Sequence, residues 1–178
     1  MTSAGEPPGS DTRSPGLPED ARARVVTVSD RSSAGERADT SGPLLAEMLT
    51  RLGFAVDGVV VVPDEVAAVQ DALRSAVAGG CDVVLTTGGT GLSPRDVTPE
   101  ATRALLEREA PGLADAVRRE GQDAVPTSVL SRGVAGTVGR SLVVNLPGSR
   151  GGVRDGVAAL APVRGHAVAQ LRGGGDHG

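Results

Sequence analysis

The 178-residue sequence contains no lysine, since all 18 of its basic residues are Arg. This absence excludes enzymes whose chemistry needs a lysine, namely phosphate-loop NTPases, protein kinases and pyridoxal or other Schiff-base enzymes. Cys81 is the only cysteine. One chain therefore cannot form an internal disulfide or a cysteine-based zinc or iron–sulfur site, and its composition is typical of an intracellular protein.

Histidine and aromatic residues are also scarce. Of the two histidines, His177 lies in a glycine-rich end, so a Ser–His–Asp triad is not expected. With one Phe, no Trp or Tyr and a net charge of −4, the chain offers neither stacking platforms nor a basic surface for nucleic acid. It also lacks a run of roughly 18 apolar residues and a basic-then-apolar leader. We therefore expect a cytoplasmic protein with no nucleic-acid or membrane partner.

The two ends of the chain have little to bury. Residues 1–21 are rich in Pro, Gly and Ser, cannot offset the entropy cost of ordering, and are predicted to form a disordered tail. The glycine-rich residues 172–178 are predicted to form a second, flexible tail. One domain remains over residues 22–171, a size that suits a single hydrophobic core.

Apolar runs of strand length alternate with helical patterns in this domain. Val-rich runs predict buried strands at residues 23–28, 59–62, 83–86 and 142–146. Apolar residues at helical spacing predict helices near 43–52, 66–77, from 98 onward, 113–121 and 152–171, the last with a bend near Pro162. The alternation predicts an α/β fold, in which a mostly parallel sheet carries helices on both faces.

A glycine-rich segment follows the third predicted strand. Residues 86–91 read TTGGTG, where the glycines let main-chain amides approach a nucleotide phosphate and Thr87 and Thr90 add hydroxyls. The alternative is a mobile surface turn. Because ligands of such sheets bind beyond the carboxyl ends of the strands, the position of the segment favours a phosphate loop.

Two carboxylates follow strand ends. Asp96 lies five residues past Gly91, and Asp64 follows the run at 59–62. Converging strand ends would bring both to one cation, and Mg²⁺ is typically held by one or two carboxylates together with phosphate oxygens. Each Asp also has a structural explanation as the N-cap of the helix that follows it. Capping is the default for Asp64 and is evenly balanced with metal binding for Asp96.

Other polar residues gather at three strand ends, where their hydroxyl, amide and guanidinium groups could bind a phosphate or a polar ring. These candidates are Ser29, Asp30 and Arg31; Ser131 and Arg132; and Asn145, Pro147, Gly148 and Ser149.

The motifs occur in a fixed order along the chain. TTGGTG is followed by RDVTPEAT at 95–102, EREAPG at 107–112, LSR at 130–132 and NLPGS at 145–149. With this set the chain resembles, over residues 24–171, the Mog/MoaB family of molybdenum-cofactor biosynthesis. It is most similar to the molybdopterin adenylyltransferase branch, which includes the G domain of gephyrin. The resemblance implies a three-layer α/β domain that forms a homotrimer.

The resemblance also implies a reaction. The domain would bind molybdopterin and Mg-ATP, transfer AMP to the terminal phosphate of the pterin, release pyrophosphate and pass the product to a MoeA-like molybdenum insertase. By motif, Asp64 and Asp96 match the catalytic, metal-binding carboxylates, and residues 87–91 match the nucleotide loop. The nine strand-end candidates would line the pterin and phosphate cleft.

Catalysis in such a site would depend on alignment and charge stabilisation. We expect the two Asp to bind metal and position substrates, with Arg31, Arg95 or Arg132 supplying positive charge.

Two other functions stay open. The chain could be a non-catalytic, MoaB-like pterin-binding or scaffold trimer, because its VAG at 134–136 also occurs in MoaB-like sequences. The presence of both Asp64 and Asp96 favours the active branch. An unrelated nucleotide-binding α/β domain would bind ATP without affinity for a pterin.

Overall fold

The computed structural model describes residues 16–174, which form a six-stranded sheet in the spatial order β2-β1-β3-β6-β5-β4. The strands are β1 (Arg22–Val28), β2 (Ala55–Val62), β3 (Val83–Thr87), β4 (Arg108–Glu109), β5 (Ala135–Val138) and β6 (Ser141–Leu146). β2, β1, β3 and β6 are parallel, whereas β5 pairs antiparallel with β6 and β4 with β5. The mostly parallel sheet predicted from the sequence is confirmed, and the antiparallel pair at one edge is an addition.

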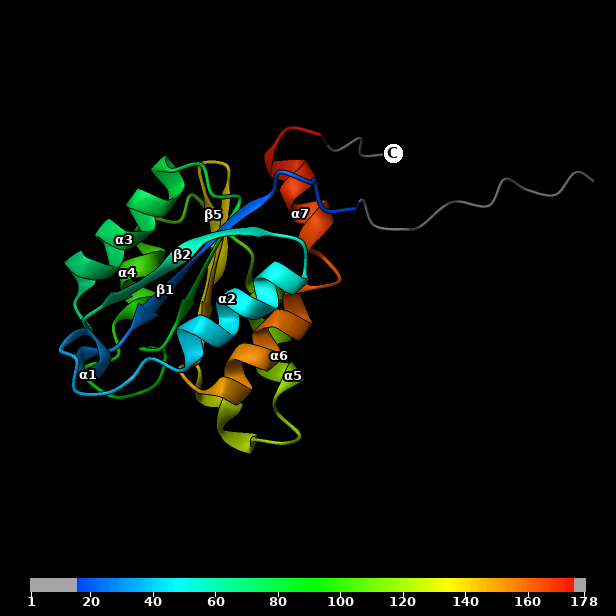
Figure 1. The fold of residues 1–178 in the computed structure, drawn as a ribbon. Coiled ribbons are helices and arrows are strands. Elements are labelled where there is room, and N and C mark those ends of the chain that lie inside the picture. The colour runs from blue at the N-terminus through cyan, green and yellow to red at the C-terminus, as the bar shows by residue number, and fades with distance from the viewer. Residues whose placement is uncertain (1–15, 175–178) are drawn as a thin grey trace, which may run out of the picture.

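Helices cover both faces of the sheet and make three layers (Figure 1). One face carries α2 (Ser41–Arg51), α5 (Pro111–Glu120), α6 (Arg150–Leu160) and α7 (Arg164–Leu171), and the other carries α3 (Val66–Ala78) and α4 (Thr98–Arg103). The short helix α1 (Asp30–Ser33) and the 3-10 helix η1 (Pro126–Leu130) lie in connecting segments. Among the described residues, no helix combines the length and apolar character that a bilayer crossing needs.

The central strands β3 and β6 are buried along their whole length. Alternate residues of β3 face opposite cores, so Leu85 packs with the α2, α5, α6 and α7 side and Val84 packs with the α3 and α4 side. A strand that is covered on both faces has no polar face, which explains the apolar runs of β3 and β6. The burial predicted for the Val run at 59–62 is wrong, because β2 is an edge strand and Val60 and Val61 are exposed.

Two predicted elements have different bounds in the structure. The helix predicted over 152–171 is two helices, because Pro162 has no amide hydrogen to donate and its ring clashes with the preceding turn. The strand predicted at 59–62 starts at Ala55 instead. Gly58, with φ +87°, lies at an irregularity in the pairing with β1 and interrupts the sequence pattern.

The packed part of the chain extends beyond the predicted domain bounds of residues 22 and 171 at both ends. The predicted tail over 1–21 overlaps the core, since Leu17 packs against it and Ala21 is fully buried. Arg172, predicted to start the second tail, forms an ion pair with Asp82. Residues 1–15 and 175–178 lie outside the described residues.

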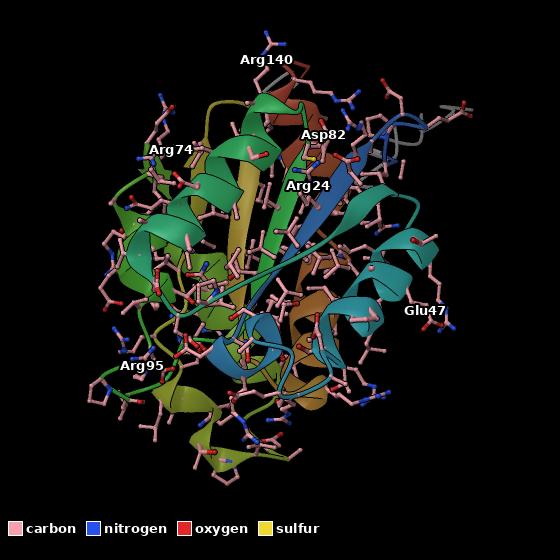
Figure 2. The ribbon with its side chains drawn as sticks, turned by 60° about the vertical axis from the view of Figure 1, so that its left-hand side comes forward. Arg24, Glu47, Arg74, Asp82, Arg95 and Arg140 are labelled. Atoms are coloured by element: carbon pink, nitrogen blue, oxygen red, sulfur yellow. The ribbon has the colours of Figure 1, made fainter. Side chains whose placement is uncertain are left out.

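The strand order creates a switch point between β1 and β3. The chain leaves the end of β1 toward β2 through α2 on one face, whereas it leaves the end of β3 toward the opposite edge of the sheet through α4 on the other face. Crossovers that diverge in this way open a crevice at the carboxyl ends of the two strands. Arg95 marks this end of the sheet in Figure 2, whereas Asp82 and Arg24 lie toward the other end.

Candidate active site

The site begins with the glycine turn at the end of β3. Gly88 and Gly89 have φ values of +102° and +67°, a region that residues with a side chain rarely adopt. A Cβ on Gly88 would lie 2.3 Å from the carbonyl oxygen of Val28, and a Cβ on Gly89 would lie 2.3 Å from Oγ1 of Thr98. The turn therefore runs directly against the end of β1, and only glycine fits at these two positions.

Hydrogen bonds to Thr98 hold this turn from the α4 side. The amide of Thr98 donates to the carbonyl of Gly89 at 3.1 Å, and its hydroxyl donates to the carbonyl of Gly88 at 2.9 Å. Within residues 16–174, the amides of Gly89, Thr90 and Gly91 donate to no protein acceptor. A run of such amides is the arrangement expected of a loop that binds phosphate.

Asp64 lies between this turn and the end of β1. Its Oδ2 accepts a 2.8 Å hydrogen bond from the amide of Asp30, and its amide donates at 2.9 Å to Oδ1 of Asp30. The N-cap of α3 is Glu65, with no side-chain cap bond, so helix capping does not explain Asp64. Its other oxygen, Oδ1, would lie 3.1 Å from a Cβ on Gly89. The carboxylate therefore touches the glycine turn.

Asp96 touches the same loop two residues further along. Its Oδ2 accepts a 3.1 Å hydrogen bond from the amide of Ser93 and would lie 2.8 Å from a Cβ on Gly91. The N-cap of α4 is Val97, without a side-chain cap bond, so Asp96 is not the helix cap either. Both predicted carboxylates lie against the glycine loop.

The charges around Asp64 act on one another. Burial raises the pKa of Asp64 above its ordinary value; the hydrogen bond from the amide of Asp30 opposes this, and the negative charges of Asp30 and Asp96 reinforce it. The amide of Asp64 and the guanidinium of Arg95 lower the pKa of Asp30. Among the described residues, no group of three or more His, Cys, Asp or Glu could hold a metal ion. A cation here would need ligands from a bound phosphate as well.

A polar hollow of about 190 Å³ lies in the crevice between β1 and β3. Ser29, Thr87, Gly88 and Gly148 line it, all of them predicted site residues. Arg37 also lines this hollow, and the sequence analysis missed it because it lies in a polar loop with no motif. No described residue pairs with Arg37 in a salt bridge, so its positive charge can meet an anion.

A larger hollow of about 380 Å³ lies on the other side of the loop and is mostly apolar. Leu92, Val117, Val125 and Leu130 form its apolar part. Five predicted residues line it, the last of them at the start of α6: Thr90, Gly91, Ser131, Pro147 and Ser149. There Ser149 accepts a 3.0 Å hydrogen bond from the amide of Gly152 and caps the helix.

Two predicted site residues, Asn145 and Arg31, line neither hollow. Asn145 is 3% exposed, and its amide group donates to the hydroxyls of Thr86 and Thr102 at 3.0 Å each. It belongs to the interior and not to the cleft wall. The sequence already indicated this burial, because Asn145 lies within a predicted buried strand. Arg31 lies exposed on α1.

Arg132 is committed to the loop itself. Its Nε donates to the carbonyl of Gly91 at 2.8 Å, its Nη2 donates to the carbonyl of Asp96 at 2.9 Å, and Nη1 pairs with Glu100. Arg95 pairs likewise with Asp30. The positive charge expected from Arg95 and Arg132 therefore meets protein acceptors, which leaves Arg37 and the loop amides to face an anion.

Known proteins are similar to this chain in sequence and in fold. Residues 24–166 match a family described as "Probable molybdopterin binding domain". A crystal structure of a molybdopterin biosynthesis protein from Mycobacterium abscessus is 52% identical with a TM-score of 0.83, and the match covers 88% of this chain and 98% of that one.

Curated relatives point to the same family. The molybdopterin adenylyltransferase of Escherichia coli is 37% identical over 83% of this chain and 77% of its own length. The molybdenum cofactor biosynthesis protein B of Bacillus cereus is 39% identical, over 86% and 92%. The chain spans about half the length of two further relatives, bacterial bifunctional proteins of molybdenum cofactor biosynthesis. The chain belongs to the Mog/MoaB family of molybdopterin-binding proteins of molybdenum cofactor biosynthesis.

Proposed function

We propose that this chain is a molybdopterin adenylyltransferase. It would transfer AMP from ATP to the terminal phosphate of molybdopterin and release pyrophosphate. The relative of that name in Escherichia coli supports the proposal. The observation that carries it is the contact of both Asp64 and Asp96 with a glycine loop whose amides are available to phosphate.

The residues present fit a divalent cation that is shared with ATP. Two carboxylates, Asp64 and Asp96, lie at the loop, and the described residues offer no third acidic or imidazole ligand. Mg²⁺ is commonly held by one or two carboxylates, with nucleotide phosphates completing the ligand set. When bound, it would neutralise negative charge that spreads over the phosphates.

The chain's own groups would align two anions. An oxygen of the pterin phosphate forms a bond to the α-phosphorus of ATP, the bond from that phosphorus to the bridging oxygen breaks, and pyrophosphate leaves with the electron pair. The attacking oxygen is already ionised, so no protein base is needed. The amides of Gly89, Thr90 and Gly91 would donate to phosphate oxygens, and Arg37 would supply positive charge.

Two hollows flank the loop, and two substrates must meet there. The smaller one is polar, and Arg37 lines it, whereas the larger one has apolar walls and the start of α6 beside it. Flat heterocycles bury well against apolar walls, and helix N-termini favour phosphates. We therefore place the reacting phosphates on the loop, with the remainder of the two substrates extending to opposite sides.

The test is turnover with defined substrates. Purified protein incubated with molybdopterin and Mg-ATP should release pyrophosphate, and Asp96→Ala should abolish the release. Asp71→Ala, which removes an exposed carboxylate on α3, is the matched control and should keep the wild-type rate. Binding of pterin without any pyrophosphate would instead support a non-catalytic pterin carrier. Binding of ATP without pterin would support an unrelated nucleotide-binding domain.

The assembly and the onward partner are proposed on the same family basis. In analytical ultracentrifugation, a homotrimer would have three times the chain mass of 17.8 kDa. A monomer at micromolar concentration would contradict the proposed trimer. The product would pass to a MoeA-like molybdenum insertase. The bifunctional relatives, about twice the length of this chain, support a partnership with another enzyme of the pathway.

A further inference from the structure

Asp30 and Asp64 bind each other's main chains. The amide of each donates to the carboxylate of the other, at 2.8 Å and 2.9 Å. The pair joins the segment after β1 to the segment after β2, although 34 residues separate them in sequence. Because Oδ2 of Asp64 is held in this way, its Oδ1 is the atom that faces Gly89.

Asp30 also binds the loop that carries Asp96. Its Oδ2 accepts hydrogen bonds from Arg95, at 2.7 Å from Nε and also from Nη2. Arg95 immediately precedes Asp96 and lies at the periphery of the molecule (Figure 2). A single carboxylate thus connects three strand ends, those of β1, β2 and β3.

Both oxygens of Asp30 accept hydrogen bonds from the protein, Oδ1 from the amide of Asp64 and Oδ2 from Arg95. Its contacts therefore go to Asp64 and to the neighbour of Asp96. We propose that Asp30 is a positioning residue, which holds Asp64 and Asp96 at the separation that a shared cation needs. This inference rests on the proposed function and reassigns Asp30 from contact with pterin or phosphate.

Two properties of the glycine loop explain why a positioning residue is needed there. Residues 88–96 contain three glycines, so holding one conformation costs much backbone entropy. Two like charges at one site also repel each other. Outer hydrogen-bond partners of metal ligands typically contribute about 10- to 100-fold to metal affinity or activity. Asp30 would act in this way on both carboxylates at once.

The experiment compares three variants with the wild-type protein. Asp30→Ala removes the side-chain bonds to the amide of Asp64 and to Arg95, and keeps only the bond from the main-chain amide of residue 30 to Asp64. Arg95→Gln removes only the connection to the glycine loop. Asp57→Ala is the matched control, because Asp57 accepts from Arg22 and Arg24 toward the other end of the sheet. Its side chain is 37% exposed, close to the 34% of Asp30. All three variants remove a carboxylate–Arg contact of similar burial.

Three quantities are measured on each protein. Amide hydrogen exchange of Asp64 in the ligand-free protein reports the connection to Asp30. Electron paramagnetic resonance of manganese reports the binding of Mn²⁺–ATP, and thermal unfolding reports stability. For Asp30→Ala we expect faster exchange at Asp64 and Mn²⁺–ATP binding weakened by about 10- to 100-fold. Arg95→Gln should weaken binding less and leave exchange at Asp64 slow. Asp57→Ala should match the wild type in binding and in exchange at Asp64.

A purely structural role would lower the unfolding temperature of Asp30→Ala and leave its binding of Mn²⁺–ATP equal to that of the wild type. That result would overturn the inference. Should Asp30→Ala fail to fold, Asp30→Asn keeps one acceptor for the amide of Asp64, weakens the bond to Arg95, and should bind as Arg95→Gln does. A wild-type protein that binds no Mn²⁺–ATP contradicts the proposed function itself. Weak binding by the variant alone supports the role of Asp30.

Discussion

Arg172 and Asp82 form a bidentate ion pair that connects the end of the described residues to the sheet. Nε of Arg172 lies 2.8 Å from Oδ1 of Asp82, and Nη2 lies 2.8 Å from Oδ2. The same guanidinium donates at 2.8 Å to Asp20, ahead of β1, and Asp82 also accepts from the amide of Arg22. Asp82 lies next to the start of β3. The pair therefore joins both ends of the described chain to a central strand.

Replacing Asp82 should destabilise the fold more than replacing an exposed carboxylate. In Asp82→Asn the size is kept, but an NH₂ group faces the Arg172 guanidinium in place of one acceptor. Hydrogen bonds to charged groups contribute about 1.5–3 kcal/mol each, so we expect the free energy of unfolding to fall by about 2 kcal/mol. Urea unfolding at pH 7 measures it. Asp71→Asn, at an exposed ion pair on α3, should change it by less than about 0.5 kcal/mol.

Acid should weaken the same connection. Burial alone would raise the pKa of Asp82, but hydrogen bonds from Arg172 and from the amide of Arg22, together with their charges, outweigh it and lower the pKa. The ionised group thus contributes full stability above the unfolded value of about 3.9, and this contribution is lost as the pH falls through the lower folded value. Between pH 7 and pH 2.5, the free energy of unfolding should fall less steeply for Asp82→Asn than for the wild-type protein. Parallel curves for the two proteins would refute this role.

Gly88 should not tolerate alanine. Its φ of +102° is unfavourable for a residue with a side chain, and the new Cβ would lie 2.3 Å from the main-chain oxygen of Val28. Strain in the backbone alone costs about 1–3 kcal/mol, and the clash with main chain adds to it. Gly112→Ala is the control, because a Cβ there meets nothing within 4 Å in α5. In urea unfolding, Gly112→Ala should be neutral or slightly stabilising and Gly88→Ala strongly destabilising.

The layers of the fold were predictable from sequence because buried parallel strands produce long Val-rich runs. β3 and β6 are buried at every position, whereas the Val run of β2 lies at an edge of the sheet and is partly exposed. β4 and β5 gave no such signal, since β4 has two exposed residues and β5 contains a glycine. The break between α6 and α7 at Pro162 was visible only as a bend, because periodicity alone does not tell a kinked helix from two helices.

The site was predictable in its residue types and less so in their contacts. The positions of Asp64 and Asp96 followed from strand ends, but the mutual bonds of Asp30 and Asp64 depend on β1 and β2 being neighbours. Likewise the use of Arg132 to hold the loop depends on the chain after η1 passing beside Thr90, where the amide of Arg132 donates to the carbonyl of Thr90 at 2.8 Å. Long-range pairing of this kind has no local pattern in a single sequence.

Asn145 should matter for stability more than for substrate affinity. Its Nδ2 donates to the hydroxyls of Thr86 and Thr102, and its Oδ1 accepts from the amide of Val134 at 3.2 Å. Asn145→Ala would leave the buried amide of Val134 without an acceptor, which costs about 1–3 kcal/mol. We expect urea unfolding of Asn145→Ala to show this loss of about 1–3 kcal/mol in the free energy of unfolding. At low temperature, where the variant stays folded, its KM for ATP should be unchanged. Gln122→Ala, at an exposed amide, serves as the control. A raised KM for ATP together with wild-type stability would instead show that Asn145 contributes to substrate binding.

Asp96→Asn should separate stability from catalysis. The amide oxygen of Asn can still accept from the amide of Ser93, so the loop keeps its 3.1 Å contact and the melting temperature should change by no more than about 2 °C. The lost charge removes half of the carboxylate pair at the loop, and pyrophosphate release should fall at least about a hundredfold. The substitution also removes one of the charges that raise the pKa of Asp64, so this pKa should fall in a titration followed by NMR. Unaltered turnover together with a large loss of thermal stability would mean that Asp96 serves the fold and that the cation is held elsewhere.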